Sequence, residues 1–359
     1  MKQVKKIFQT LKKIFLGYET PPCVGVDIGS ASIKMVELFD NSLKIANYSI
    51  NAVRKDLIVH GVINNIEQVS AIILRQWELL DSEYKQVAIA IPYNAVIIKD
   101  ITVPKFKTKY ELDNYVLKQL VQELDTDDID FDYVIKLDQL NEQRLLVIVA
   151  KKEKIEEYQA VIQLSGIKIA VIDIEPFAIQ NLFDKLLKKK PLGKQMVLID
   201  IGVTRVRAYA FEQKHIYFNE ISVNYHSCIE DMLMDYDKDF ILKDVVDING
   251  LLLDLIADNR IKPSELVNLI VADVNKLLQL VKSNLLVEKK VTLAEDYEIY
   301  LMGGNSLIPG VLQKISKMQC VKVNSADRFI SSDNMQIPNQ DLIRLIPAIA
   351  LATWGQQIA

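Results

Sequence analysis

The sequence predicts an α/β protein whose two lobes face each other across a cleft. The tripeptide Asp-Ile-Gly occurs twice, at residues 27–29 and 200–202, and each copy directly follows an apolar run typical of a buried strand. A third strand-like run, residues 298–302, ends in the pair Gly303 and Gly304. A repeated strand and glycine turn indicates a duplicated lobe, and three such turns together are typical of a site between lobes.

The first Asp-Ile-Gly copy carries every group that a phosphate-binding turn needs. Asp27 at the end of its strand would hold Mg²⁺ through water, and Gly29 would let the backbone turn sharply and present N–H groups to phosphate oxygens. Ser30 and Ser32 add hydroxyl donors, and Lys34 adds positive charge. This segment is therefore predicted to bind the phosphates of a nucleotide.

The second copy and the glycine pair complete the predicted site. Asp200 and Gly202 repeat the first motif, but only Thr204 supplies a hydroxyl, and two arginines, Arg205 and Arg207, stand where small polar residues would be expected. At the third turn, Gly303 and Gly304 would allow a flat ring or a phosphate to approach the main chain, beside Asn305. Any one of these segments alone is more often an ordinary turn, whereas the ordered set favours a site.

This order of motifs resembles the actin-like ATPase superfamily, and within it the PilM family of type IV pilus assembly proteins. The narrower resemblance is carried by residues 24–38, 88–104, 169–182 and 301–310, and it extends over residues 22–356. It implies a ribonuclease-H-like, two-lobed fold with a small inserted α+β subdomain, as in the FtsA family. It also implies ATP or ADP in the cleft, with Mg²⁺ held mainly through water by Asp27 and Asp200.

The chain is expected to have five parts, of which residues 1–20 fall outside the resemblance. The first lobe is expected at residues 21–97 and 169–195, the insertion at 98–168, and the second lobe at 196–340 with helices over about 226–294. A C-terminal helix at 341–359 is expected to return toward the first lobe. Independently of the resemblance, the sequence predicts a helix at residues 66–80. It predicts a second, longer helix after Pro263, where apolar residues recur at 3.6-residue spacing.

Residues 1–20 form a separate part, predicted to be a basic amphipathic helix. Lysines segregate from the apolar positions when the segment is projected as a helix. Residues 1–17 would lie on an anionic bilayer, would pack on the chain itself or on a partner, or would be disordered in isolation. The segment lacks the features of a secretory signal.

Composition narrows the function classes. Half of the 359 residues are hydrophobic, yet no run approaches the roughly 18 apolar residues that span a bilayer. A net charge of −4 without a basic stripe argues against a nucleic-acid partner. Three isolated cysteines fit a reducing cytoplasm and neither a disulfide scaffold nor a zinc site. Three histidines without ligand spacing argue against a metal–histidine centre.

The partners are implied by the resemblance. PilM-like proteins capture the short cytoplasmic tail of the membrane protein PilN in a groove between the first lobe and the insertion. The chain is accordingly expected at the cytoplasmic face of the inner membrane, with other pilus platform and motor proteins, and self-association stays open.

Catalysis has the weakest signal. Glu175, before Pro176, would either polarise water or fix the turn, and no residue is identified by spacing as the group that orients an attacking water. The stretch 221–225 has no glycine, and Lys243 has no obvious acidic mate. We expect at most a weak ATPase, with nucleotide as a structural or regulatory ligand. An FtsA-like membrane-tethered filament and a small-molecule kinase of the same superfamily are the alternatives.

Overall fold

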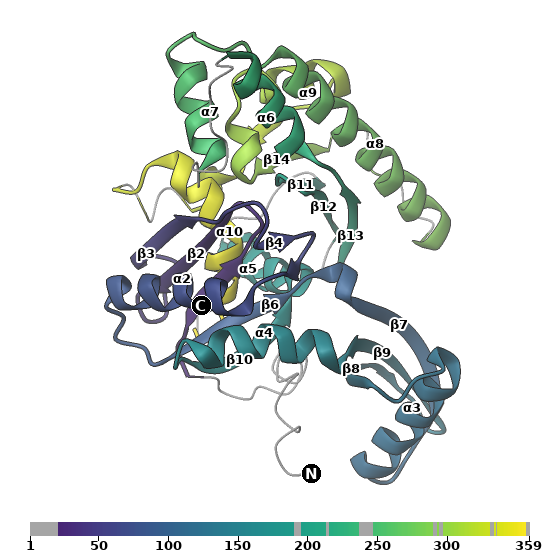
Figure 1. Ribbon diagram of the computed structural model, residues 1–359. Coiled ribbons are helices and arrows are strands. Elements are labelled where there is room, and N and C mark those ends of the chain that lie inside the picture. The colour runs from purple at the N-terminus through teal and green to yellow at the C-terminus, as the bar shows by residue number, and fades with distance from the viewer. Residues whose placement is uncertain are drawn as a thin grey trace.

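Two five-stranded sheets with the same strand order form the two lobes of the protein (Figure 1). The computed structural model describes residues 21–189, 195–212, 215–236, 247–289, 293, 297–330, 334 and 336–356. The predicted helix at 1–20 and Lys243 lie outside these residues. No helix in the described part of the chain is long and apolar enough to cross a membrane.

The first sheet has the order β10-β6-β1-β2-β3. β1, β6 and β10 run parallel, while β2 and β3 pair antiparallel with β1 and with each other. The strands are β1 (Val24–Ile28), β2 (Ser32–Leu38), β3 (Ile45–Ala52), β6 (Gln86–Ile91) and β10 (Lys168–Ile174), with a small hairpin of β4 (Ile58–Val59) and β5 (Val62–Ile63) beside them. The residues of β1 before Asp27 are buried on both faces, which explains the apolar run Val24–Val26.

The second sheet, β13-β12-β11-β14-β15, repeats the strand order and directions of the first. Its strands are β11 (Met196–Ile201), β12 (Arg205–Glu212), β13 (His215–Ser222), β14 (Glu298–Met302) and β15 (Val323–Ser325). β11 corresponds to β1, so the two Asp-Ile-Gly turns occupy equivalent positions. The duplication predicted from these turns is confirmed.

Each sheet is covered by helices on its outer face. On the first sheet these are α2 (Ile66–Leu80) and α4 (Lys152–Leu164), which pack on each other. On the second they are α6 (Tyr225–Tyr236), α7 (Ile248–Ala257), α8 (Ser264–Lys289) and α9 (Val311–Gln319). The apolar stripe of α8, including Leu266, Ile270 and Val274, lies in this core as its spacing predicts.

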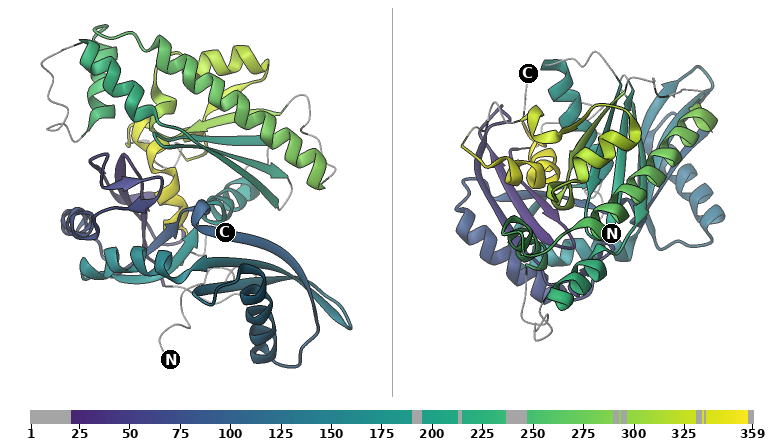
Figure 2. Two further views of the ribbon diagram at one scale, coloured as in Figure 1. Left: turned by 45° about the vertical axis from the view of Figure 1, so that its right-hand side comes forward. Right: turned by 90° about the horizontal axis from the view of Figure 1, so that it is seen from above.

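The helices α5 (Glu175–Lys189) and α10 (Asn339–Ala352) lie between the two sheets and share one apolar core with both (Figures 1 and 2). α10 crosses β1 so closely that a Cβ on Gly25 would lie 2.0 Å from the carbonyl oxygen of Ala348. Small residues on both elements make this approach possible. Since α10 also contacts β14, it mechanically connects the lobes.

A third sheet, β7-β9-β8, projects from the first lobe and carries α3 (Lys109–Leu124) on one face (Figure 2). Its strands are β7 (Val96–Pro104), β8 (Ile129–Asp138) and β9 (Glu142–Lys151). The insertion expected at residues 98–168 would include α4, which packs on α2 and on β9. Ile155 and Tyr158 of α4 lie in one core with the first-lobe strands and with residues of β8 and β9. The elements that form their own core therefore span residues 96–151.

Candidate functional site

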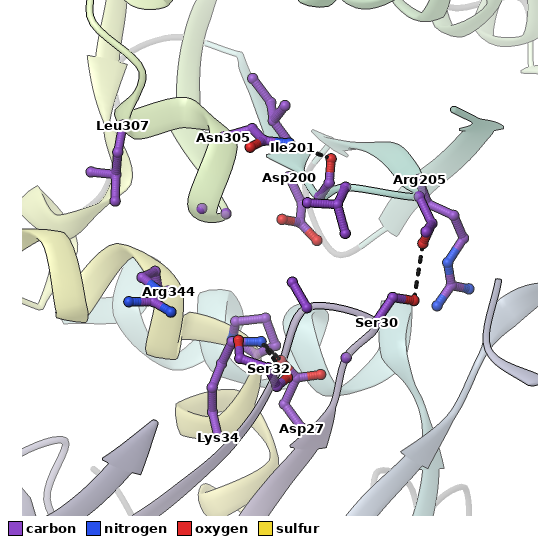
Figure 3. Close-up of a pocket in the computed structure, with 18 of the residues that line it drawn as sticks. Asp27, Ser30, Ser32, Lys34, Asp200, Ile201, Arg205, Asn305, Leu307 and Arg344 are labelled. Atoms are coloured by element: carbon purple, nitrogen blue, oxygen red, sulfur yellow. Dashed lines mark hydrogen bonds and ion pairs between the residues drawn. The ribbon is translucent and has the colours of Figure 1, made fainter. Parts of the chain in front are cut away.

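A cleft between the two lobes is lined by all eleven residues predicted to bind nucleotide (Figure 3). The first lobe contributes Asp27, Gly29, Ser30, Ser32 and Lys34, and the second contributes Asp200, Gly202, Thr204, Gly303, Gly304 and Asn305. The cleft holds about 1040 Å³ of space not filled by atoms, part of it open to solvent.

The two phosphate-loop candidates have the same local structure. The N–H of Gly29 donates to Ser32 O at 3.2 Å, and the N–H of Gly202 donates to Arg205 O at 3.0 Å. The loops then meet, because the hydroxyls of Ser30 and Thr204 are 3.0 Å apart and hydrogen bonded across the cleft (Figure 3). An anion between the lobes would therefore meet hydroxyls from both loops.

Each aspartate is paired with a cation seven residues further along its own hairpin. Lys34 Nζ lies 2.8 Å from Asp27 Oδ2, and Arg207 Nη1 lies 2.6 Å from Asp200 Oδ2. In both pairs the two residues are direct cross-strand partners. Arg207 is thus the structural counterpart of Lys34, a relation that the unequal sequences of the two turns conceal.

The fit of Mg²⁺ differs between the two aspartates. No group of three or more His, Cys, Asp or Glu suited to a metal occurs in the described part of the chain, so an ion would depend on water and phosphate oxygens. Asp27 fits such an ion, because its partner is a flexible lysine that can turn to a phosphate. Asp200 fits less well, because an ion there would have to displace the buried guanidinium of Arg207.

The arginines of the second turn bind carboxylates. Arg207 Nη2 lies 3.1 Å from Glu175 Oε1, and Arg205 Nη1 lies 3.9 Å from Glu175 Oε2 and 3.7 Å from Glu220 Oε2. Burial raises the pKa of Glu175, and both arginines oppose that shift. Burial also works to lower the pKa of Arg207, but Glu175 and Asp200 outweigh it and hold this pKa well above its ordinary value.

This network links the lobes, because Glu175 begins α5 whereas both arginines lie on β12. The sequence suggests that Glu175 polarises water or fixes a turn. The structure adds contacts that neither role includes, with two arginines of the other lobe. The carboxylate is neutralised from the opposite lobe and faces the cleft already paired. Sequence reasoning missed Glu220, which lies across from Arg207 on β13 and has no motif around it.

The third loop shapes the other end of the cleft. Gly303 has φ +86°, and a Cβ there would lie 2.3 Å from Asp200 Oδ1, so the fold itself requires this glycine. A Cβ on Gly304 would meet nothing within 4 Å. Asn305, almost fully buried, donates from Nδ2 to Gly202 O at 3.0 Å and so holds the second loop in place.

Several lining residues were not predicted. The apolar side chains Leu253, Leu307 and Ile308 line the cleft. Leu307 and Ile308 belong to the short helix that begins at Gly304 and to the residue after it, and an apolar lining there would favour a base over a phosphate. Arg344 reaches the cleft from α10 (Figure 3). Leu307 and Ile308 lie in the segment 301–310, but Leu253 and Arg344 lie in no motif, and helical spacing on α10 would have identified only the buried face.

The duplicated sheets and the cleft between them define a protein with the actin-like ATPase fold. The chain belongs to the family described as type IV pilus assembly protein PilM, whose profile matches residues 25–354. A solved structure described as a PilM-PilN type IV pilus biogenesis complex is similar at 16% identity with a TM-score of 0.69, over 94% of this chain and 99% of that one. The ethanolamine utilization protein EutJ from Carboxydothermus hydrogenoformans is similar at 14% identity with a TM-score of 0.51, over 96% and 95%. At these identities the likeness shows the fold, and the predicted fold class and family are confirmed.

Proposed function

We propose that the chain binds ATP or ADP in the interlobe cleft, with its phosphates at the two Asp-Ile-Gly turns. The observation that carries the proposal is the meeting of both turns at the Ser30–Thr204 hydrogen bond, inside a cleft that also receives the third loop. Lys34 would turn from Asp27 to a phosphate, and Asp27 would then hold a hydrated Mg²⁺. The base would lie toward Gly304 and Leu307, where the lining is apolar.

Calorimetric titration with ATP, with and without Mg²⁺, tests this site. The double variant Asp27→Ala, Lys34→Ala should lose binding, because it removes the lysine charge that would compensate the phosphates and the carboxylate that would hold Mg²⁺. A matched control is Lys105→Ala, Asp138→Ala, which removes an ion pair of 2.8 Å on the surface of the insertion and should bind like the parent. Absence of binding by the folded parent protein would refute the proposal.

Nucleotide is proposed to be a structural or regulatory ligand rather than a substrate in rapid turnover. Glu175 is the acidic residue at the junction of the lobes, and two arginines already hold its carboxylate. A carboxylate neutralised in this way orients an attacking water poorly. Single-turnover hydrolysis of bound ATP measures this, and turnover at about 1 s⁻¹ or faster, the range of ordinary enzymes, would contradict it.

We further propose that the chain binds the cytoplasmic tail of a PilN-like membrane protein at the first lobe and its insertion, and so works at the cytoplasmic face of the inner membrane. Family membership and the likeness to a PilM-PilN complex support this partner. A ligand that prefers one arrangement of the lobes would alter tail binding by shifting that population.

The insertion can be removed without cutting the first-lobe helix α4. Val96 and Ala150 are paired across β7 and β9, so their backbones lie side by side and a short glycine linker can replace residues 97–149. The shortened protein should keep ATP binding and lose binding of a synthetic tail peptide. Unchanged peptide binding by a shortened protein that still binds ATP would refute a role for the insertion.

A further inference from the structure

Arg344 is a cation of the cleft that the described part of the chain leaves unpaired. It lines the cleft from α10, and it makes no hydrogen bond or ion pair with any residue in the described ranges. The other cations that line the cleft there, Lys34, Arg205 and Arg207, each lie within ion-pair distance of a carboxylate. Arg344 is half-buried at the wall of the cleft, so its guanidinium is available to a ligand bound there.

The position of Arg344 restricts what that ligand group is. The backbone of the preceding residue is tied to the third loop, because Gly303 N–H donates to Ile343 O at 3.4 Å. Figure 3 shows Arg344 on the α10 side of the cleft, below Leu307 and on the far side of Lys34 from Ser30. Arg344 therefore lies at the apolar end of the cleft, away from the Ser30–Thr204 contact.

We propose that Arg344 stacks on the base of the bound nucleotide and makes the cleft selective for purines. The base would lie between this guanidinium on the first-lobe side and the surface of Gly304 and Leu307 on the second-lobe side. Gly304 leaves the necessary space, since a Cβ there would have no atom of the described residues within 4 Å. A planar guanidinium attracts an aromatic face, and the larger purine ring offers more of that face than a pyrimidine does.

The inference rests on the proposed nucleotide site, and the two can be tested apart. Dissociation constants for ATP and UTP, which differ in the base alone, are measured by calorimetry for the parent protein and for Arg344→Ala. The parent should prefer ATP. The variant should lose roughly 5- to 30-fold in ATP affinity, the range of a desolvated cation–π contact, while UTP affinity changes less and the preference falls toward one.

Two further variants complete the design. Arg344→Lys keeps the positive charge but loses the planar guanidinium, so it should retain only part of the preference for ATP over UTP. It replaces the alanine variant if that variant does not fold. Arg75→Ala removes an exposed arginine from α2 and should match the parent. Equal losses for ATP and UTP would mean that Arg344 contacts the phosphates, and no loss would mean that it contacts nothing. Either result overturns the inference, whereas a parent that binds neither nucleotide overturns the proposed site as well.

Discussion

Gly303 and Gly304 are adjacent residues with opposite surroundings. Gly303 is confined by Asp200 and Ile201, so Gly303→Ala should cost at least about 2 kcal/mol through a steric clash in a left-handed backbone. Gly304 is confined by nothing in the protein, so Gly304→Ala should leave the unfolding free energy equal or raise it by up to about 1 kcal/mol. The added methyl group should still weaken ATP binding about tenfold or more, because it occupies the proposed space for the base.

Chemical denaturation and calorimetry of both glycine variants measure these effects. We expect Gly303→Ala to lose stability and Gly304→Ala to lose ATP affinity while it keeps its stability. A Gly304→Ala protein that binds ATP like the parent would show that no ligand group lies against this residue.

Asp173 should make stability depend on pH. Burial raises its pKa to about 7, although the N–H of Ile174 and Trp354 Nε1, 2.8 Å away, oppose the shift. An acid whose pKa is raised on folding stabilises the fold below its ordinary pKa near 3.9, and this contribution is lost as the pH rises through about 7. Between pH 6 and 8.5 the parent should therefore lose about 1 to 2 kcal/mol that Asp173→Asn does not lose.

The comparison requires only the change between the two pH values, since any constant cost of the asparagine cancels. Urea unfolding of both proteins at pH 6 and 8.5 gives this change. Parallel pH dependence of the two proteins would mean that Asp173 is ionised throughout the range.

At the scale of elements, the sequence predicts those helices and strands whose ends and buried faces are determined by neighbouring residues. The helix at residues 66–80 begins and ends where expected, because Asn65 caps it and its apolar spacing faces the sheet. The placement of α4 could not be predicted, since its buried residues would suit a small insertion as well as a lobe. The aspartates and glycines of the cleft can be recognised from their motifs. The positions of Glu220 and Arg344 in the cleft region result from strand pairing and packing between distant segments, which the sequence does not show.

The contact between β1 and α10 predicts a large effect from a single methyl group. A Cβ on Gly25 would lie 2.0 Å from Ala348 O and 2.4 Å from Ala352 N, and both atoms belong to helix backbone that cannot yield separately. Gly25→Ala should therefore separate strand from helix and cost more than about 3 kcal/mol. The unfolding free energy measures this cost, with Gly166→Ala, where a Cβ meets nothing, as a control for the loss of a glycine at positive φ alone. Equal costs in the two variants would contradict the importance of the contact.

At the scale of the whole molecule, the interlobe network should stabilise the closed cleft. Glu175 joins α5 to Arg205 and Arg207 on β12, and side-chain exposures of 16%, 6% and 11% show that water screens these charges little. In Glu175→Gln the two arginines keep their charge but lose the carboxylate from the other lobe. Breaking a buried pair by removing one partner costs about 3 to 5 kcal/mol, so the variant should lose stability on this scale.

The same variant should also open the lobes, which distinguishes the network from an ordinary stabilising contact. Small-angle scattering of the parent and of Glu175→Gln without nucleotide should show a larger radius of gyration for the variant, and saturating ATP should reduce the difference because the phosphates would bridge both turns. Asp138→Asn, which breaks the exposed pair with Lys105, should change neither property. A destabilised Glu175→Gln protein with the parent's dimensions would mean that the shared core of α5 and α10, rather than the ion pairs, sets the distance between the lobes.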